Sequence, residues 1–450
     1  MRLIARFAQE QELFFEIITV YDNRIIKESL NKQNPALISI AKDFPSAVWF
    51  ERKISDDFGI NILYSNDERH LVKHEHFPKD VFPLRKNYAK RTTKQEKRLA
   101  ESANSESVVF GPVHPYHLES SQFQIFEKNQ TILHFEMKSF FKYRAIEKML
   151  EGLTFAEARP IVERISAPQT IAYQIAFLEI ERQASKRALP DVLRKRHLFL
   201  LEYERIMNHL NNLSILSQLL EFKEAIYLFS NFLEEGRELF QKLTGHRFGF
   251  ASISFENNFS EMGELHTFFQ DLENELITFN KWTSRKKECL ATLQSVGVLE
   301  KKIAEKYGLV GTVARASGVA IDARQKESLY EKNSFYIDFQ EEGDVYARYN
   351  LKIDEILSSL TLMKNFMNAN VPPYFISTVE DGEYYSYVES ATGEVMMYMA
   401  LKKGVINRFF LRDPSFLNAQ VLPHLVRGSS VDSLGLIVES MALNISAIDM

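Results

Sequence analysis

The sequence is almost free of cysteine: among its 450 residues, Cys289 is the single one. A disulfide framework, a CxxC zinc site and an iron–sulfur cluster held by this chain are therefore excluded, because each needs several thiolates. Cys289 lies in KKECLATL, a helical pattern in which a buried filler is favoured over a nucleophile. We expect no metal ion and no cluster to be bound by this chain.

An excess of basic charge and long apolar runs are also missing. The formal net charge is −5, which argues against a nucleic-acid partner because phosphate recognition needs a concentrated basic surface. No apolar run is long enough to cross a bilayer, and no signal peptide opens the sequence. We expect a cytoplasmic protein with no transmembrane segment of its own.

The order of patterns along the chain predicts two folded parts. Residues 1–88 contain short apolar runs such as LFFEIITVY, which are typical of short strands. They predict a small α+β domain. Residues 89–108 are polar and charged, as is typical of a linker. A larger domain is expected over residues 109–450.

Most of the larger domain, from Phe140 to about Tyr307, has the periodicity of long helices. Pro160 and Pro168 predict an irregular junction between two of them. On the next helix, Glu202, Arg205 and His209 fall at spacings i, i+3 and i+7 beside an apolar stripe. Such a row is either a solvated face or an internal polar network, and the spacing alone favours the solvated face.

Three polar side chains follow the stiff turn GPVHP at residues 111–115. His114, His117 and Glu119 are close enough in sequence to act as metal ligands or as a proton relay. A plain polar turn is the alternative, and the segment by itself favours it.

The end of the chain is unusual because it is apolar. Alternating runs at Glu394–Leu401 and Val405–Leu411 predict a hairpin around Lys402–Gly404. A nearly continuous apolar segment, Leu434–Ile448, then predicts that the chain buries its own terminus. The glycine-rich stretch GLVGTVARASG at residues 308–318 has neither of the phosphate-loop spacings, so a nucleotide site is rejected there.

Several motifs carry a family resemblance. In the first domain, ERxxxDxFGI followed by PLRKxY resembles the 30-kDa (C) subunit of respiratory complex I. Six later blocks resemble the 49-kDa (D) subunit of complex I and the large subunit of energy-converting nickel-iron hydrogenases. These blocks are GPVHP (111–115), LEYERIMNHL (201–210), GRELFQKLTGHRF (236–248), GLVGTVARASGVAIDAR (308–324), ESATGEV (389–395) and FFLRDPSFLNAQVLPHLVRG (409–428).

The resemblance implies an α+β protein. A small N-terminal α+β domain would precede a mostly helical, hydrogenase-large-subunit-like domain, with a central helix bundle and small β-hairpins at its ends. One departure is decisive for the chemistry. The hydrogenases hold nickel and iron with two CxxC pairs, whereas this chain has VERISAPQTIAY at the first place and ALNISAIDM at the second. Thiolates supply the soft ligands that such a metal needs, so hydrogen activation at a nickel-iron centre is excluded.

The resemblance also implies roles for individual residues. His114, His117 and Glu119 would line a remnant of the metal cavity, with Glu119 as a proton relay. In complex I a histidine and a tyrosine bind quinone; His117 stands one residue before the place of that histidine, and Glu163 stands at that of the tyrosine. Thr392 replaces an arginine that is usual in the family. An internal charged network is expected from Arg164, Glu202, Arg205, His209, Arg315 and Asp322.

The function implied is that of a subunit in a membrane-associated, energy-converting oxidoreductase complex that couples electron transfer to proton or ion translocation. Its partners would be a small iron–sulfur subunit, similar to the B subunit of complex I, and antiporter-like membrane subunits. The chain would lie peripherally on the inner face of the cell membrane. Two alternatives remain: a quinone-binding C/D subunit of an NADH-quinone oxidoreductase, and a non-catalytic structural paralogue.

Overall fold

The computed structural model describes residues 1–450 except 75–76, 79, 89–106, 114–118, 255–262, 287, 289, 334 and 367–378. His114, His117, Cys289 and nearly all of the expected linker 89–108 therefore lie outside the described residues.

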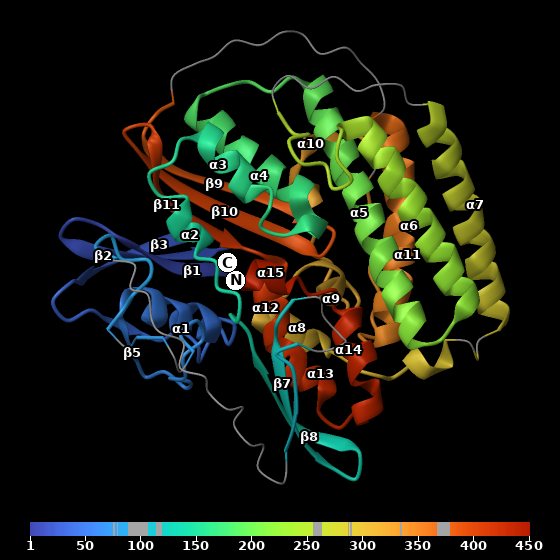
Figure 1. Cartoon of the computed structure of the whole chain (residues 1–450), viewed down its shortest axis with the longest axis horizontal. Coiled ribbons are helices and arrows are strands. Elements are labelled where there is room, and N and C mark those ends of the chain that lie inside the picture. Colours follow the sequence, from blue (N-terminus) through green and yellow to red (C-terminus); the bar gives the residue numbers. More distant parts are fainter. Residues whose placement is uncertain are drawn as a thin grey trace.

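The N-terminal unit is built on an antiparallel sheet of order β1-β2-β3 (Figure 1). Its elements are β1 (Leu3–Glu10), β2 (Phe14–Tyr21), β3 (Ile25–Asn31), α1 (Ala47–Phe58) and the parallel pair β4 (Ala36–Ile38) and β5 (Asn61–Leu63). Helix α1 packs against β1 and ends at Gly59, whose φ of 68° suits a glycine cap. The predicted small α+β unit is present.

A second antiparallel sheet, of order β6-β7-β8, opens the remainder of the chain. It consists of β6 (Ser107–Phe110), β7 (Gln122–Lys128) and β8 (Thr131–Lys138). Asn129 and Gln130 form its tight turn with positive φ angles of 53° and 64°. Strands β7 and β8 thus form a hairpin.

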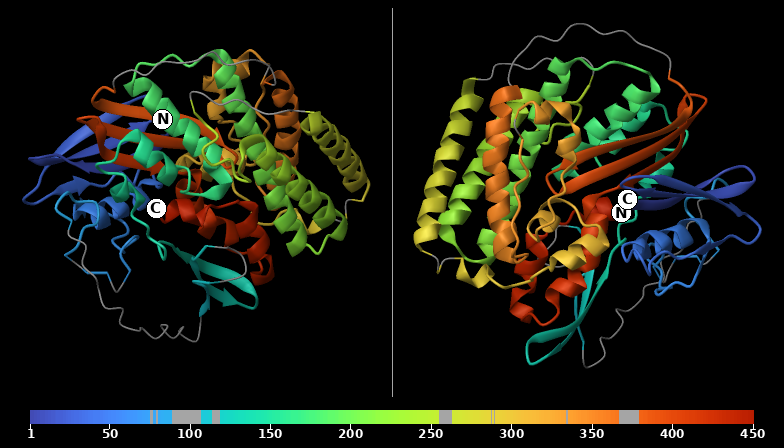
Figure 2. Two further views of the ribbon diagram at one scale, coloured as in Figure 1. Left: turned by 45° about the horizontal axis from the view of Figure 1, so that its top comes forward. Right: turned by 180° about the vertical axis from the view of Figure 1, so that it is seen from behind.

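Long helices form the body of the molecule, and α5, α6, α7 and α11 lie side by side in all three views (Figures 1 and 2). The helices between the second sheet and the end of α11 are α2 (Ile146–Met149), α3 (Phe155–Val162), α4 (Thr170–Ala184), α5 (Asp191–Leu219), α6 (Lys223–Thr244), α7 (Gly263–Arg285), α8 (Lys301–Tyr307), α9 (Gly311–Arg315), α10 (Ser328–Glu331) and α11 (Val345–Phe366). Between α3 and α4, residues 163–169 form the irregular junction that the prolines predict.

A third antiparallel sheet, of order β11-β10-β9, lies between the bundle and the N-terminal unit (Figure 1). Its strands are β9 (Gly382–Ser390), β10 (Gly393–Lys402) and β11 (Val405–Arg412). Strand β10 is buried along nearly its whole length because α4 packs on one side and β1 lies near β11. Phe7 stacks on Phe410 at 4.2 Å between ring centroids, which joins the first unit to this sheet. The predicted hairpin at 394–411 is confirmed.

The C-terminal segment winds back into the core through four short helices. They are α12 (Pro414–Asn418), α13 (Leu422–Val426), α14 (Leu434–Ser440) and α15 (Ile445–Ile448). Ile448 and Met450 are only 1% and 4% exposed. The Asp449 carboxylate accepts a hydrogen bond from the backbone N–H of Phe140 at 2.6 Å. The chain does bury its own end, as its apolar pattern predicts.

In the glycine-rich block, Gly311 lets the start of α9 come close to the backbone of the turn between β9 and β10. Gly311 begins α9 with a φ of 70°, and a Cβ atom there would lie 1.8 Å from the carbonyl oxygen of Thr392. Only glycine allows the turn between β9 and β10 to come this near. The contact fixes α9, and with it Arg315, against the sheet.

Candidate functional site

A cavity of about 510 Å³ lies where the α3–α4 junction meets the C-terminal segment. Residues 166–168 and 442–446 form two parts of its wall, although they are far apart in the sequence. The inner faces of α5 and α6, with the loop that follows α6, close the rest. These are the two segments in which the resemblance places the thiolate pairs of the nickel-iron hydrogenases.

The wall carries polar atoms with no partner among the described residues. They are Ser166 Oγ, Asn212 Oδ1 and Asn444 Nδ2, and all three residues line the cavity. A buried polar group without a hydrogen bond is costly, so such groups often mark a place where a ligand or water binds. The hydroxyl and the amides provide donors and acceptors, but they are not ligands that would hold nickel and iron. These residues therefore do not fit the metal centre of the hydrogenases.

Glu204, on α5, also lines the cavity and bonds the first turn of α4. Its two carboxylate oxygens accept hydrogen bonds from the backbone N–H groups of Ile171 at 2.6 Å and Ala172 at 3.2 Å. Burial raises the pKa of Glu204 to about 8, although these two hydrogen bonds act to lower it. Burial thus disfavours the ionised form of this carboxyl group on the cavity wall. Sequence reasoning missed Glu204, because it falls outside both the apolar stripe and the charged row of α5.

Of the residues predicted for the cavity, Glu119 lines it. Its carboxylate accepts from Lys142 Nζ at 2.7 Å, and its side chain is 39% exposed. Glu163 is placed away from the wall: its Oε2 accepts from the backbone N–H of Ala251 at 2.7 Å. The carboxylate is thus used to hold the loop after α6 and does not face the cavity.

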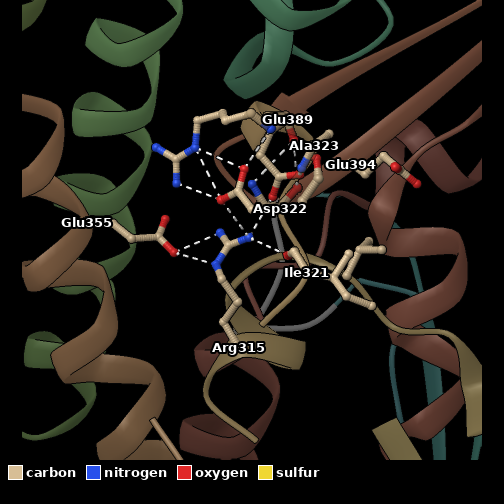
Figure 3. A network of polar contacts seen from close by, with 12 residues as sticks. Arg315, Ile321, Asp322, Ala323, Glu355, Glu389 and Glu394 are labelled. Atoms are coloured by element: carbon tan, nitrogen blue, oxygen red, sulfur yellow. Dashed lines mark hydrogen bonds and ion pairs between the residues drawn. The ribbon is translucent and has the colours of Figure 1, made fainter. Parts of the chain in front are cut away.

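A buried network of charged side chains centres on Arg315 (Figure 3). The Arg315 guanidinium donates to Glu355 Oε1 at 2.7 Å and to Glu389 Oε1 at 2.7 Å. It also lies 3.2 Å from Asp322 Oδ2. Arg315, on α9, thereby connects α11 with β9 through ion pairs that are closed to solvent.

The network extends to α5 through a second set of ion pairs. Arg324 bonds Asp322 at 2.7 Å and Glu202 at 3.3 Å, and Arg205 donates to Glu202 Oε2 at 3.1 Å. Tyr330 and Ser359 donate their hydroxyl protons to Glu202, each at 2.5 Å. The charged row of α5 is therefore internal. The expectation of a solvated face from spacing alone is wrong, because α11 and β9 cover that face of the helix.

His209 completes the network on α5 and is uncharged. Burial lowers the pKa of His209 to about 4, although its Nε2 lies 2.9 Å from Glu355 Oε2. As a neutral ring it donates from Nε2, which leaves Nδ1 without a partner among the described residues. Although burial acts in the opposite sense, Arg315 and His209 hold the pKa of Glu355 well below its usual value.

Five of the six residues predicted for the network are thus brought together, and Arg164 is not. The Arg164 side chain is 51% exposed, lies 4.4 Å from the ring centroid of Phe250, and donates to the Pro160 carbonyl at 2.8 Å. A cation is favoured there because carbonyl groups at the end of α3 point outward. Sequence reasoning missed three members: Arg324 and Glu389, which stand within blocks that carry the resemblance, and Glu355, which no motif marks.

The network is not neutral when all its acidic groups are ionised. It contains the carboxylates of Glu202, Asp322, Glu355 and Glu389 and the guanidinium groups of Arg205, Arg315 and Arg324. One negative charge is in excess, and a buried net charge is costly. Burial and the neighbouring Asp322 raise the pKa of Glu389 to about 7, so the network holds a proton close to neutral pH.

Within the described ranges, no three or more His, Cys, Asp and Glu side chains come together as a metal site. Among the helices that the structure describes, none combines the length and the apolar character needed to cross a membrane.

Comparison with known proteins gives two family matches. The family described as the 49 Kd subunit of respiratory-chain NADH dehydrogenase matches residues 225–376 and 374–450. The family described as the 30 Kd subunit of the same enzyme matches residues 5–94.

Individual relatives span most of the chain. Formate hydrogenlyase subunit 5 of Escherichia coli is 23% identical and covers 92% of this chain and 77% of its own length. The C/D subunit of the NADH-quinone oxidoreductase of Phocaeicola vulgatus is 24% identical and covers 82% of this chain and 78% of its own. In fold, the chain is similar to a chain of the membrane-bound sulfane sulfur reductase, an archaeal respiratory membrane complex. That likeness has a TM-score of 0.72 at 21% identity and covers 78% of this chain and 100% of the other.

Proposed function

Because the chain belongs to the family of the 49 Kd subunit of respiratory-chain NADH dehydrogenase, we propose that it is the corresponding subunit of a membrane-associated, energy-converting oxidoreductase complex. In this complex it has no nickel-iron centre of its own. It couples electron transfer from a partner iron–sulfur subunit to proton or ion translocation.

The observation that carries the proposal is the cavity between residues 166–168 and 442–446. The cavity lies at the two segments in which the resemblance places the metal ligands of the hydrogenases, and Ser166 and Asn444 line it in place of thiolates. Buried polar groups without partners are costly, so their presence around the cavity favours a site that still has a function. The cavity therefore receives a ligand or protons rather than a metal ion.

Electrons would reach the cavity from outside this chain. With one cysteine the chain cannot hold an iron–sulfur cluster. A small iron–sulfur subunit, similar to the B subunit of complex I, is therefore the expected partner, docked on the helical domain. Antiporter-like membrane subunits would carry the ions, with this chain peripheral on the cytoplasmic face of the membrane.

The organisation of the chain supports the same assignment. Residues 1–88 would act as the 30 Kd-like domain, residues 89–108 as the linker and residues 109–450 as the 49 Kd-like domain. Phe7 and Phe410 stack across the two parts, which supports a direct contact between the fused domains. Glu119 on the cavity wall, together with His114 and His117, would exchange protons with solvent.

A quinone-binding C/D subunit is the second candidate. Relatives named as C/D subunits of NADH-quinone oxidoreductase cover more than four fifths of the chain, and the cavity volume of about 510 Å³ falls in the range of ligand pockets. In that case the hydroxyl and amide groups of the wall would bind the carbonyl oxygens of the quinone ring.

Purification of the tagged chain from gently solubilised native membranes tests the proposal. We expect an iron–sulfur subunit and antiporter-like subunits to copurify, with iron and without stoichiometric nickel. Titration of the purified complex with a short-tailed quinone then separates the two candidates. A chain that purifies alone would instead be a structural paralogue, and one nickel per chain would refute the proposal.

A further inference from the structure

Lys352 is a buried cation that the charged network does not include. It lies on α11 and is fully buried. Its Nζ donates to the backbone carbonyl oxygens of Arg348 at 3.2 Å and Ser440 at 2.8 Å. In the part of the chain that the structure describes, no ion pair within 4.0 Å is formed between Lys352 and a carboxylate. A buried ammonium group held only by carbonyl oxygens is expensive to keep charged.

On one side, Lys352 adjoins the network. Glu355 stands three residues further along α11 and so lies on the same face of the helix. Its negative charge favours the protonated form of Lys352, whereas the Arg348 guanidinium disfavours it. His209 on α5 also senses the charge of Lys352, which further lowers the pKa of His209.

On the other side, Lys352 adjoins the cavity. Ser440, which accepts its hydrogen bond, is the last residue of α14. The preceding residue, Glu439, lines the cavity, and its carbonyl oxygen accepts from Nδ2 of Asn212 at 2.8 Å, another residue of the wall. The end of α14 therefore connects the residue that accepts from Lys352 with a residue of the cavity wall.

The charge balance gives Lys352 a role that Arg348 cannot have. The network carries four carboxylates against three guanidinium groups. With all four carboxylates ionised, a protonated Lys352 provides the missing positive charge; protonation of Glu389 is the other way in which the network becomes neutral. Burial and Arg348 lower the pKa of Lys352 to about 7, whereas the pKa of Arg348, lowered by burial to about 10, leaves that residue charged at neutral pH.

We propose that Lys352 is a proton-binding site that links the charge of a molecule in the cavity to the charge of the buried network. The inference rests on the proposed function in taking the cavity as the place where charge arrives. A negative charge in the cavity favours the ammonium form, so Lys352 takes up one proton from solvent. When the charge leaves, the proton on Lys352 is released.

Titration of the full-length chain labelled with ¹³C at the lysine Cε position tests the site. We expect one lysine signal to titrate with a midpoint near 7, far below the usual value of about 10.4. That signal should be absent from Lys352→Met and from Lys352→Gln, and either variant suffices for the assignment. If every lysine signal titrates above about 9.5, the proposal is wrong.

A second arm tests the link to the cavity. Asn208→Asp places a carboxylate on the cavity wall, and the Lys352 midpoint should rise by about half a unit or more. Gln270→Glu adds the same charge at an exposed position of α7 and should leave the midpoint unchanged. Equal shifts in the two variants, or none in Asn208→Asp, would refute the link. Both arms use the isolated chain, whereas the proposed function is tested by copurification of the partners. The proton site can therefore be refuted while the proposed function holds, and the proposed function can be refuted while the proton site holds.

Discussion

Ser166, in the junction between α3 and α4, and Asn444, at the start of α15, lie on the wall of one cavity. Each has a buried side-chain atom with no hydrogen-bond partner among the described residues. In the hydrogenases that the sequence resembles, these two segments carry the metal-binding thiolates. The two segments that the resemblance pairs with the thiolate-bearing segments of the hydrogenases thus lie together on one wall, which here carries a hydroxyl and an amide.

Removal of the Asn444 amide should affect ligand binding more than folding. Since Nδ2 of Asn444 has no partner to lose among the described residues, Asn444→Ala should change the free energy of unfolding by less than about 1 kcal/mol. Titration of the purified complex with a short-tailed quinone should show weaker binding than in the unmodified complex. Asn66→Ala, at an exposed position, is the matched control and should change neither quantity. A large loss of stability in Asn444→Ala would show that the amide is structural.

Removal of Arg315 should strongly destabilise the chain. Arg315→Met leaves Glu355, Glu389 and Asp322 buried without their shared partner. Loss of one member of a buried ion pair costs about 3–5 kcal/mol, which urea unfolding measures. Arg285→Met removes the same charge from an exposed side chain of α7 and should cost less than about 1 kcal/mol. Similar losses in the two variants would contradict the assignment of Arg315 as the centre of the network.

Much of the architecture could be predicted because it depends on local pattern. The hairpin at 394–411, the helix junction near Pro160 and the buried terminus each follow from spacing along a short segment. The site depends on what packs against each face, which the spacing does not contain. The row Glu202, Arg205 and His209 is the same pattern whether water or α11 covers it. Glu355 was missed because a carboxylate in a mixed helix carries no signal, and Arg164 was misplaced because a neighbouring Phe250 offered it a surface position.

The raised pKa of Glu204 predicts a pH dependence of stability. Its pKa is raised by burial from the usual 4.5 to about 8, so between these values the folded chain binds more protons than the unfolded chain. Its contribution to stability is full below about pH 4.5 and is lost as the pH rises to about 8. The loss is at most about 1.4 kcal/mol per pH unit.

Urea unfolding at several pH values between 5 and 8 checks this dependence. Glu204→Gln is uncharged throughout, so the wild-type chain should lose stability relative to the variant as the pH rises. Parallel pH profiles for the two proteins would mean that Glu204 is ionised in the folded chain.

Gly311 should tolerate no side chain. In Gly311→Ala the new Cβ would lie 1.8 Å from the carbonyl oxygen of Thr392, at a φ of 70°. The contact must open, so we expect a loss of several kcal/mol or an unfolded chain, measured by thermal unfolding. Gly318→Ala has a similar φ of 79°, but its nearest neighbour would be 3.5 Å away. It should cost only about 1 kcal/mol of backbone strain. Comparable losses at both positions would refute the role of the close approach.

Reconstitution of the purified complex in sealed vesicles tests the central claim most directly. Ion accumulation would be measured after addition of a low-potential electron donor, alongside the nickel content of the same sample. The account predicts that ions accumulate only when this chain is present, in a complex without stoichiometric nickel. Electron transfer with no ion accumulation, or one nickel per chain, would contradict it.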